Sequence, residues 1–513
     1  MLAKVRSFSL FGITGYDIEI EVDISNGIPA FDIVGLADTA VKESKERVRS
    51  AIKNNGCDFP IMRVTVNLAP AFMKKEGSSF DLPIAIGVLM ATGQINIKHP
   101  DRYGFTGELA LDGSLRRING VLPMSIRARS SGLQALFVPS ENALEAAVVE
   151  GIAVYPARSL TDIVNHFNGN DEINSVDIDA KGILAEGRAP DLDFCDVRGQ
   201  EQAKRALEIT ACGGHHCILL GPPGSGKTML AKRLPSILPH LSYDESVEIT
   251  MIHSVAGMLP PGVSLLSSRP FRNPLTSASP ASLTGGGKIP KPGEISLAHN
   301  GVLFLDELPE FGPQALDVLR QPLEDGVVTI SRVASKITYP ARTTFVCAAN
   351  PCKCGYSRDS MRPCTCTASE IRKYFGRISG PLLDRIDLQI EVRMQAYDEL
   401  YKDKPAGETS WKIRERVERA RSIQKKRYNG LNIFTNSQLE GGMVDKFCRL
   451  NSRSRDLMRD IFNRMALSAR AHNKILKVAR TIADLEGDEC ILERHLAEAI
   501  SYRCLDRDSR AGE

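Results

Sequence analysis

The sequence has little net charge and no long apolar run. Over 513 residues, 65 Lys and Arg nearly balance 62 Asp and Glu, so the net charge is only +3. A surface that binds nucleic acid would therefore be a local basic patch and not a general excess of positive charge. The most apolar stretch, residues 83–90, is too short to cross a membrane. We therefore expect no membrane association.

The beginning of the sequence also lacks the pattern of an export signal. Lys4 and Arg6 are followed by a mixed polar stretch and soon by Asp17, instead of a continuous apolar segment. We therefore expect the protein to be cytoplasmic. In a reducing compartment the twelve cysteines are expected to be free thiols or metal ligands. The sequence also contains no tandem repeat.

Length and residue pattern predict a multidomain α/β protein, because 513 residues exceed what one core usually holds. Residues 1–167 alternate strand and helix patterns. Residues 168–194 are acidic and poor in large apolar residues, which predicts a linker. Residues 195–394 predict a doubly wound parallel sheet, and residues 395–513 are helical in pattern.

Hydrophobic periodicity predicts the individual elements. In the first domain we expect strands at 5–11, 17–22, 63–68, 135–138 and around 154, with helices at 38–54 and 81–92. In the second we expect helices at 202–211 and 228–234, and strands at 217–220, 302–305 and 344–348. The helices expected near the end are 412–428, 442–449, 452–466, 468–485 and 493–502.

The most specific motif lies between a predicted strand and a predicted helix. Its glycines let backbone N–H groups turn toward phosphate oxygens, and the helix N-terminus adds a positive dipole end. Lys227 is predicted to contact the β- and γ-phosphates of ATP, and the hydroxyl of Thr228 to bind Mg²⁺. The complete P-loop match, predicted to bind ATP, is Gly221, Pro222, Pro223, Gly224, Ser225, Gly226, Lys227 and Thr228.

Two later strand ends carry polar residues that suit ATP hydrolysis. The apolar run 302–305 ends in Asp306 and Glu307, and in a parallel sheet that end lies beside the P-loop. Asp306 is predicted to hold Mg²⁺, directly or through water, and Glu307 to orient and deprotonate the attacking water. Asn350 follows the strand at 344–348, where its amide would position that water or sense the γ-phosphate. The alternative is that Asn350 is an ordinary turn residue.

The combination of these motifs resembles a known family. The P-loop, Asp306-Glu307, Asn350 and the segment 382–387, Leu-Leu-Asp-Arg-Ile-Asp, resemble those of AAA+ ATPases of the magnesium-chelatase-like branch. Four further segments are similar to the bacterial ComM/YifB group: Gly199-Gln200, 203–207, Gly213-Gly214-His215-His216 and 377–380. The resemblance covers essentially the whole chain.

That family implies a ring hexamer with a Lon-protease-like (S5-like) N-terminal α/β domain, a P-loop AAA+ core and a C-terminal helical lid. It implies ATP-driven branch migration on single-stranded and branched DNA during recombination of transforming DNA. The resemblance gives Arg385 the role of an arginine finger that reaches the neighbouring subunit's γ-phosphate, and Arg470 that of the sensor-2 arginine. A trans arginine is worth on the order of 10³–10⁵ in rate. The alternative for each is a surface ion pair.

Two insertions are candidates for DNA contact. Residues 269–287, rich in Arg, Ser, Pro and Gly, lie where the family places a helix-2 insert that points into the ring pore. Residues 327–339 predict a hairpin with a basic middle, which the family's wider clade directs toward the channel. Arg332 and Lys336 are therefore predicted to contact the DNA backbone. The alternative is a solvated hairpin tip, and nothing in the sequence resembles a module that reads base sequence.

Four cysteines form two Cys-x-Cys pairs: Cys352, Cys354, Cys364 and Cys366. Four thiolates at this density suit a tetrahedral Zn²⁺. Two disulfides are the alternative, which a reducing setting disfavours. Because the pairs lie between the third strand and the arginine finger, we expect a structural clamp on a loop at the rim of the active site.

Residues 75–82 resemble the serine segment of Lon-type proteases, with Ser79 near the position of the nucleophile. That chemistry needs a neighbouring lysine as the base. The resemblance places Met124 where the family's lysine would lie, and the nearby cations are arginines, which cannot act as bases. We therefore expect the fold without the protease activity, and a domain that binds DNA or assembles the ring.

Together these features predict a homo-hexameric DNA motor that uses ATP, Mg²⁺ and a structural Zn²⁺. One alternative is a magnesium-chelatase motor subunit, against which the added N-terminal domain and the cysteines speak. A second alternative is a Lon-like protease or protein remodeller.

Overall fold

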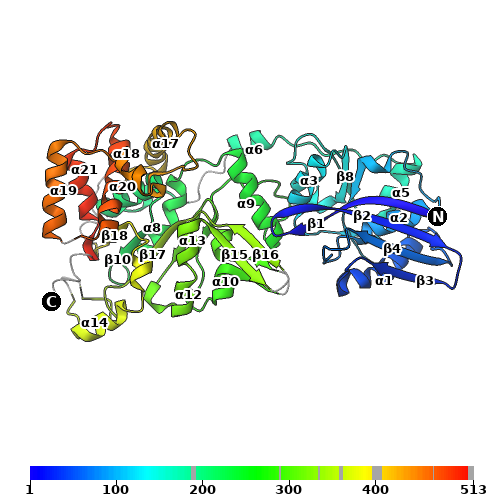
Figure 1. Ribbon diagram of the computed structural model, residues 1–513, viewed down its shortest axis with the longest axis horizontal. Helices are drawn as coiled ribbons and strands as arrows, with labels where there is room; N and C mark the ends of the chain where they lie inside the picture. Colours follow the sequence, from blue (N-terminus) through cyan, green and yellow to red (C-terminus); the bar gives the residue numbers. More distant parts are fainter. Residues whose placement is uncertain are drawn as a thin grey trace. The chain divides into compact units, whose positions relative to one another are not determined.

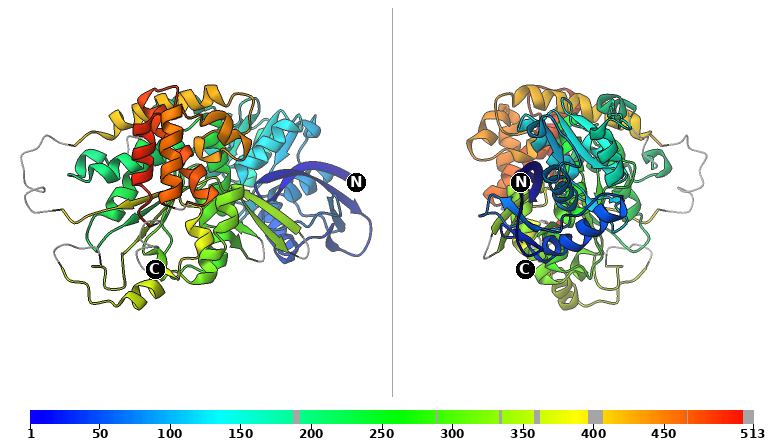
Figure 2. Two further views of the ribbon diagram at one scale, coloured as in Figure 1. Left: turned by 60° about the vertical axis from the view of Figure 1, so that its left-hand side comes forward. Right: turned by 90° about the vertical axis from the view of Figure 1, so that its right-hand side faces the viewer.

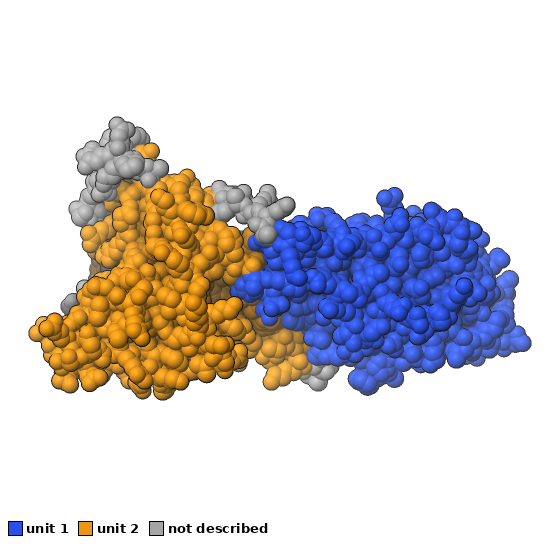
Figure 3. All heavy atoms as spheres, turned by 90° about the horizontal axis from the view of Figure 1, so that it is seen from above, with its two compact units in different colours: residues 1–187, 242–267 blue, residues 188–241, 268–513 orange. Residues whose placement is uncertain are grey.

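The computed structural model describes residues 1–186, 192–287, 290–332, 335–357, 362–395, 407–465 and 467–505. The chain forms two compact units, which Figure 3 shows in different colours. Unit 1 comprises residues 1–187 and 242–267, and unit 2 comprises residues 188–241 and 268–513. Among the described helices, none is both long and apolar enough to cross a membrane.

Unit 1 is built on a seven-stranded mixed sheet in the order β3-β4-β2-β1-β5-β8-β9 (Figure 1). The strands are β1 (Leu2–Phe11), β2 (Thr14–Ser25), β3 (Ala30–Val34), β4 (Arg63–Ala69), β5 (Tyr103–Phe105), β8 (Ala135–Pro139) and β9 (Ala153–Ala157). Burial alternates along β2, so one face of this hairpin strand supports the core. The helices α1 (Thr39–Asn54), α2 (Asp81–Ala91) and α3 (Val121–Ser130) cover the sheet, and all of α2 except Met90 is buried.

One segment packs in a different unit from its neighbours in sequence. Residues 242–267 contain α9 (Tyr243–Ala256), which packs on α3 in unit 1. The hydroxyl of Ser254 donates to the Glu145 carboxylate and accepts the Gly120 backbone N–H at 2.9 Å. The sequence pattern placed this segment within the second α/β domain, whereas its buried hydrogen bonds are made in unit 1.

Part of the acidic stretch 168–194 also packs on unit 1. The backbone N–H of Val176 donates to the carbonyl of Val154 at 2.8 Å, which adds a bridge to the sheet edge. A short helix, α6 (Ala180–Glu186), follows. Residues 187–191 lie outside the described part of the chain. Residues 168–186 of the expected linker therefore belong to unit 1.

Unit 2 contains a five-stranded, wholly parallel sheet in the order β11-β14-β17-β10-β18. The strands are β10 (Cys217–Leu220), β11 (Phe271–Arg272), β14 (Val302–Leu305), β17 (Thr344–Ala349) and β18 (Leu388–Glu391). Every residue of β10 and β14 is buried, as expected for a parallel sheet with helices on both faces. This confirms the predicted α/β fold with a parallel sheet, and it puts the ends of β10, β14 and β17 side by side.

The last part of unit 2 is helical. Its main helices are α17 (Ser410–Arg427), α18 (Gly442–Phe447), α19 (Ser452–Arg464), α20 (Ala469–Glu486) and α21 (Glu493–Ser501), each within two residues of the bounds expected from periodicity. Figures 1 and 2 show α19, α20 and α21 side by side. They share one core with α7 (Glu201–Gly213) and β10.

Candidate nucleotide site

The P-loop connects β10 to α8 (Lys227–Arg233) through a turn that requires glycine. Gly224 and Gly226 have φ angles of 79° and 91°, in the left-handed region that other residues rarely adopt. A side chain at Gly221 would meet the carbonyl oxygen of Val392 and would lie 2.9 Å from Ser225 Oγ. The predicted phosphate-binding loop thus has the tight backbone that its sequence implies.

Lys227 already lies where the predicted site needs a positive charge. Its Nζ donates to the carbonyls of Gly221 at 2.8 Å and Pro222 at 2.9 Å, and to Asn350 Oδ1 at 3.1 Å. Burial lowers the pKa of Lys227, while the charges of Asp306 and Glu307 act in the opposite direction. These carbonyls accept hydrogen bonds from the Lys227 ammonium, and the phosphate oxygens of a bound nucleotide can replace them as acceptors.

The two predicted Mg²⁺ ligands are in direct contact. The hydroxyl of Thr228 donates to Asp306 Oδ2 at 2.6 Å. Asp306 follows β14 and Thr228 lies in the first turn of α8. Hydroxyl and carboxylate oxygens are ligands that Mg²⁺ prefers, so this pair fits the ion.

Glu307 has an unusual backbone. Its φ and ψ angles of 51° and 47° are left-handed, although the residue is not glycine, and such strain concentrates at functional sites. Its backbone N–H donates to Asp306 Oδ1 at 3.0 Å, which holds the turn. The side chain is exposed, so the carboxylate can meet a water molecule beside the P-loop.

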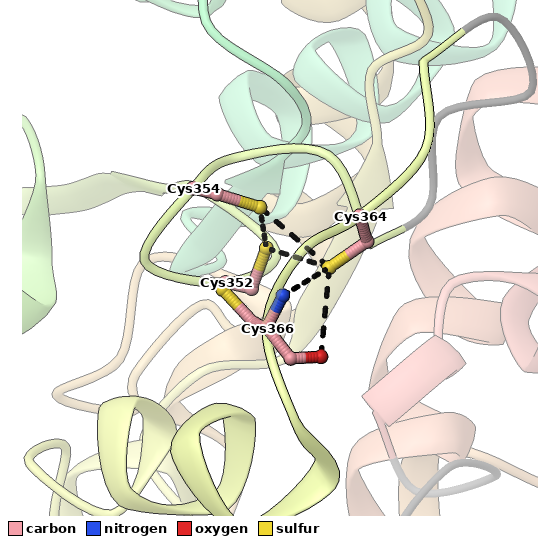
Figure 4. Close-up of side chains that lie close together, drawn as sticks. All are labelled: Cys352, Cys354, Cys364 and Cys366. Carbon is pink, nitrogen blue, oxygen red and sulfur yellow. Dashed lines mark hydrogen bonds between the residues drawn. The ribbon is translucent and has the colours of Figure 1, made fainter.

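The four predicted zinc ligands converge directly after Asn350 (Figure 4). Cys352 Sγ lies 3.2 Å from Cys354 Sγ and 3.7 Å from Cys364 Sγ, and Cys354 Sγ lies 3.6 Å from Cys364 Sγ. All four sulfurs, including that of Cys366, lie within 4.8 Å of one another. A tetrahedral site with Zn–S bonds near 2.3 Å separates its sulfurs by about 3.8 Å, whereas a disulfide has about 2.05 Å. All four cysteines are free, so the cluster fits a metal and is not a pair of disulfides.

The loop between the two cysteine pairs lies close to the P-loop. Gly355, between the two pairs, has a φ of 90°, and its backbone N–H donates to the carbonyl of Cys352 at 3.0 Å. A Cβ at Gly355 would lie 2.5 Å from Pro223 Cδ. The cysteine spacing predicts a cluster at the rim of the site, but it does not predict the approach of Gly355 to Pro223. The only signal of that approach in the sequence is the isolated glycine.

The predicted arginine finger is held by an acidic residue of its own chain. Arg385 contacts the Glu324 carboxylate of α13 (Arg320–Asp325), while its Nε is buried without a partner among the described residues. Arg470 Nη1 lies 3.6 Å from Asp384 Oδ2, next to the finger. Over the part of the chain that the structure describes, neither arginine hydrogen-bonds to the P-loop. The structure therefore connects Arg470 to Asp384, the residue before Arg385, and connects neither arginine to Lys227 among the described contacts.

The predicted DNA-binding hairpin forms from β15 (Val327–Arg332) and β16 (Ser335–Pro340), paired in antiparallel register. Lys336 is exposed on β16. The side chain of Arg332 and residues 333–334 lie outside the described part.

The other insertion uses its arginines for internal contacts. Arg269 Nε donates to the carbonyl of Pro239 at 2.7 Å. Arg272 makes two bonds to Glu294, at 2.7 and 2.8 Å. These two arginines are therefore engaged within the fold, which leaves the hairpin as the better candidate for DNA contact.

The serine segment of unit 1 has no assembled catalytic partner. Met124 is buried, and its sulfur lies 3.7 Å from the Thr106 hydroxyl. Lys75 is also buried, but its amine donates to the Pro70 carbonyl, and burial lowers its pKa. Within the described residues, no lysine hydrogen-bonds to Ser79.

A second group of potential metal ligands is an ion-pair cluster. His495 Nδ1 accepts the Leu492 backbone N–H at 3.0 Å, so its other nitrogen carries a proton. That nitrogen lies 3.1 Å from both Glu486 and Asp488. Arg494 binds the same two carboxylates. Because the ring nitrogen is a donor and arginine neutralises the acids, this cluster needs no metal.

Comparison with known proteins shows similarity along nearly the whole chain. Profiles described as magnesium chelatase subunit ChlI match residues 20–142 and 193–400, and one for the ChlI C-terminal region matches residues 407–503. The competence protein ComM of Haemophilus influenzae is 44% identical over 99% of this chain and 98% of its own length. The uncharacterized protein YifB of Escherichia coli is 43% identical over the same shares. Lon protease 2 of Bacillus subtilis is 31% identical over 138 residues, which is 26% of this chain and 25% of that protein.

Proposed function

The chain belongs to the magnesium-chelatase-related family that includes ComM and YifB, and on this premise we propose that it is a ring-forming ATPase that moves DNA. It acts as a branch-migration helicase in homologous recombination of incoming DNA during natural transformation. The similarity to a protein named competence protein supports that setting. The observation that carries the ATPase assignment is the convergence of polar side chains at three adjacent strand ends: Lys227 with Asn350, and Thr228 with Asp306.

In this proposal each residue of the site has one task. The P-loop N–H groups and Lys227 hold the β- and γ-phosphates of ATP, while Thr228 and Asp306 hold Mg²⁺. Mg²⁺ neutralises charge on the phosphates. Glu307 orients the attacking water and accepts its proton, and Asn350 positions that water. Lys227 exchanges its bonds to two loop carbonyls for phosphate oxygens, so nucleotide binding leaves its charge paired.

Arg385 completes the site of the next subunit in a homo-hexameric ring. Arg385 contacts Glu324 of α13, and Arg470 of α20 pairs with Asp384, so both arginines are held by acidic residues of their own chain. An arginine in that position can stabilise the transferring phosphoryl group of a neighbouring subunit. Glu324 is then the partner that Arg385 leaves when the neighbour binds ATP.

The cysteine cluster holds a structural Zn²⁺ in this proposal. The backbone N–H groups of Tyr356 and Thr365 lower the pKa of Cys354, whereas the pKa values of Cys364 and Cys366 are raised, in part by burial and by the neighbouring sulfurs, so Cys354 is the sulfur that loses its proton most readily. The sulfur separations fit a tetrahedral ion. The metal would fix the loop that carries Asn350 and touches Pro223.

The remaining parts of the chain also have roles in this proposal. We assign the C-terminal helices as the lid, and the N-terminal unit as a Lon-protease-like (S5-like) domain that lacks the lysine of the dyad. The first assignment is supported by the core that these helices share with β10. The second is supported by the local similarity to a Lon protease and by Met124. The hairpin with Arg332 and Lys336 is proposed to grip the DNA backbone.

The direct test is the ATPase rate of the purified protein with and without single-stranded and branched DNA. We expect stimulation by DNA, which Lys336→Ala should reduce. A protein that hydrolyses ATP but binds no DNA when loaded with ATP contradicts the helicase assignment. Electron microscopy of Glu307→Gln with ATP and forked DNA then shows whether a ring encloses the strand.

The same preparation separates the rival activities. A chelatase motor would be stimulated by porphyrin-binding partner subunits and would be indifferent to DNA. A Lon-like protease would cleave casein, and that cleavage would disappear in Ser79→Ala. We expect neither result.

A further inference from the structure

The Gly213-Gly214-His215-His216 segment has no task in the nucleotide site, yet it lies directly before β10, the strand that leads into the P-loop. His215 is fully buried. Its Nδ1 lies 2.8 Å from Asp387 Oδ2, and its Nε2 lies 2.8 Å from Thr481 Oγ1. Asp387 follows the arginine finger by two residues, and Thr481 belongs to α20. One imidazole therefore joins the finger segment to a C-terminal helix.

Gly213 provides the space for this junction. A Cβ at that position would overlap the His215 ring and would lie 2.6 Å from Thr481 Oγ1. Gly213 ends α7, and Gly214 follows with a left-handed φ of 66°. The two glycines thus end the helix and let α20 approach the histidine.

The finger segment is held at several further points by the same elements. The backbone N–H groups of Asp387 and Leu388 donate to the His216 carbonyl at 3.0 and 3.1 Å. Lys474 of α20 donates to the carbonyl of Ile386 at 3.2 Å. Burial alone would raise the pKa of Asp387, but the hydrogen bond from His215 and the nearby positive charges, including those of Lys474 and Lys477, together keep the pKa well below its usual value. Asp387 is therefore a fixed anion on which the histidine is anchored.

The junction continues into the C-terminal helices. Asn436 Nδ2 donates to Thr481 Oγ1 at 3.0 Å and to Asp484 Oδ2 at 2.9 Å. Arg427 and Arg480 bind the carboxylate of Asp484. Since buried polar networks have few alternative arrangements, a displacement of α20 would carry Asp387 with it.

We propose that His215 and Thr481 are positioning residues through which the C-terminal helices set the placement of Arg385 for the neighbouring subunit. The inference rests on the proposed trans arginine finger. Because α20 and the finger segment are joined by buried hydrogen bonds, a nucleotide-dependent shift of the C-terminal helices redirects Arg385. The segment before β10 thereby links the state of one subunit to catalysis in the next.

The test removes the hydroxyl of Thr481 while keeping its shape, in Thr481→Val. We expect kcat for ATP to fall on the order of 10²-fold, as for a misplaced catalytic group, while ATP binding stays unchanged. Thr481→Ser, which restores the hydroxyl, should recover most of kcat. Gly213→Ala should reproduce the defect by steric pressure. Gly442→Ala, a glycine of α18 where a side chain would meet open space, serves as the control that retains kcat.

Mixed rings decide where the defect lies. Lys227→Ala subunits cannot bind ATP but carry an intact finger, so adding them to Arg385→Ala subunits should restore hydrolysis at the shared interfaces. They should rescue Thr481→Val in the same way. Failure to rescue Arg385→Ala overturns the trans finger and this inference with it. Rescue of Arg385→Ala but not of Thr481→Val, or a kcat of Thr481→Val within twofold of the wild type, overturns this inference alone.

Discussion

The P-loop of unit 2 and the serine segment of unit 1 both carry side chains suited to catalysis, but their surroundings differ. Around Lys227, polar groups from three strand ends meet within hydrogen-bonding distance. In the serine segment, no lysine among the described residues hydrogen-bonds to Ser79, and the buried amine of Lys75 binds a backbone carbonyl. A reactive residue becomes a site only where its partners converge on it.

The sheets explain part of this difference. In the five-stranded sheet of unit 2 all strands are parallel, so their carboxyl ends meet at one edge. Asp306 and Asn350 follow two neighbouring strands at this edge. In unit 1 the sheet is mixed, and strand ends point to both edges. The first arrangement concentrates polar groups, and the second distributes them.

The largest expected effect is at the P-loop. Lys227→Ala removes the charge that faces the phosphates, so we expect ATPase activity to fall by at least about 10³-fold, together with ATP binding. Lys232→Ala, on the exposed side of the same helix, is the matched control and should retain both. Steady-state ATPase and nucleotide-binding measurements give the result. If Lys227→Ala kept its ATPase activity, the P-loop would not be the catalytic site that distinguishes unit 2 from unit 1.

Arg385→Ala should have the second-largest effect on ATPase activity. We expect kcat to fall on the order of 10³-fold or more, with ATP binding retained, because the arginine acts on the transition state of the neighbouring site. Arg459→Ala, an exposed arginine of α19, is the control. A loss of ATP affinity at unchanged kcat would instead indicate a role in ground-state binding.

Cys352→Ser should empty the metal site. We expect the zinc content, measured by elemental analysis, to drop from about one per chain to near zero. The exposed Cys490, outside the cluster, provides the control Cys490→Ser. Equal zinc content in the two variants would contradict the proposed site.

Gly355→Ala tests the contact between the cysteine cluster and the P-loop with the metal ligands intact. A methyl group there must displace Pro223, and overpacking of this kind costs about 1–3 kcal/mol. We expect ATP binding to weaken by roughly tenfold while zinc is retained. Gly430→Ala, where φ is also positive at 80° but a side chain would meet open space, is the matched control and should bind ATP normally.

The smallest expected effect is at the serine segment. Ser79→Ala should leave ATPase and DNA binding unchanged, since the structure shows no base beside the hydroxyl among the described residues. Casein incubated with either form should remain intact. Casein cleavage by the wild type that is lost in Ser79→Ala would show that unit 1 contains a protease active site.

Most elements and the residues of the nucleotide site could be predicted from sequence, because short apolar runs, glycine spacing and helical periodicity are local signals. Lys227, Asp306 and Asn350 were predicted in this way, and the structure brings Lys227 to Asn350 and Thr228 to Asp306. The contacts of Gly355 with Pro223 and of His215 with Thr481 could not be found, since each joins positions more than 100 residues apart. The same holds for α9, whose partners in unit 1 are set by a buried hydrogen-bond network and not by its neighbours in sequence.

By itself, the sequence determined that the chain has a phosphate-binding loop, a pair of acidic residues after an apolar strand and four clustered cysteines, because spacing along the chain specifies each of these. Only the tertiary structure decided what these groups touch. It paired Arg385 with Glu324 and Arg470 with Asp384, brought Gly355 of the cysteine loop close to Pro223, and joined the finger segment to α20 through His215. Such contacts depend on how distant elements pack, and packing is a property of the folded core as a whole.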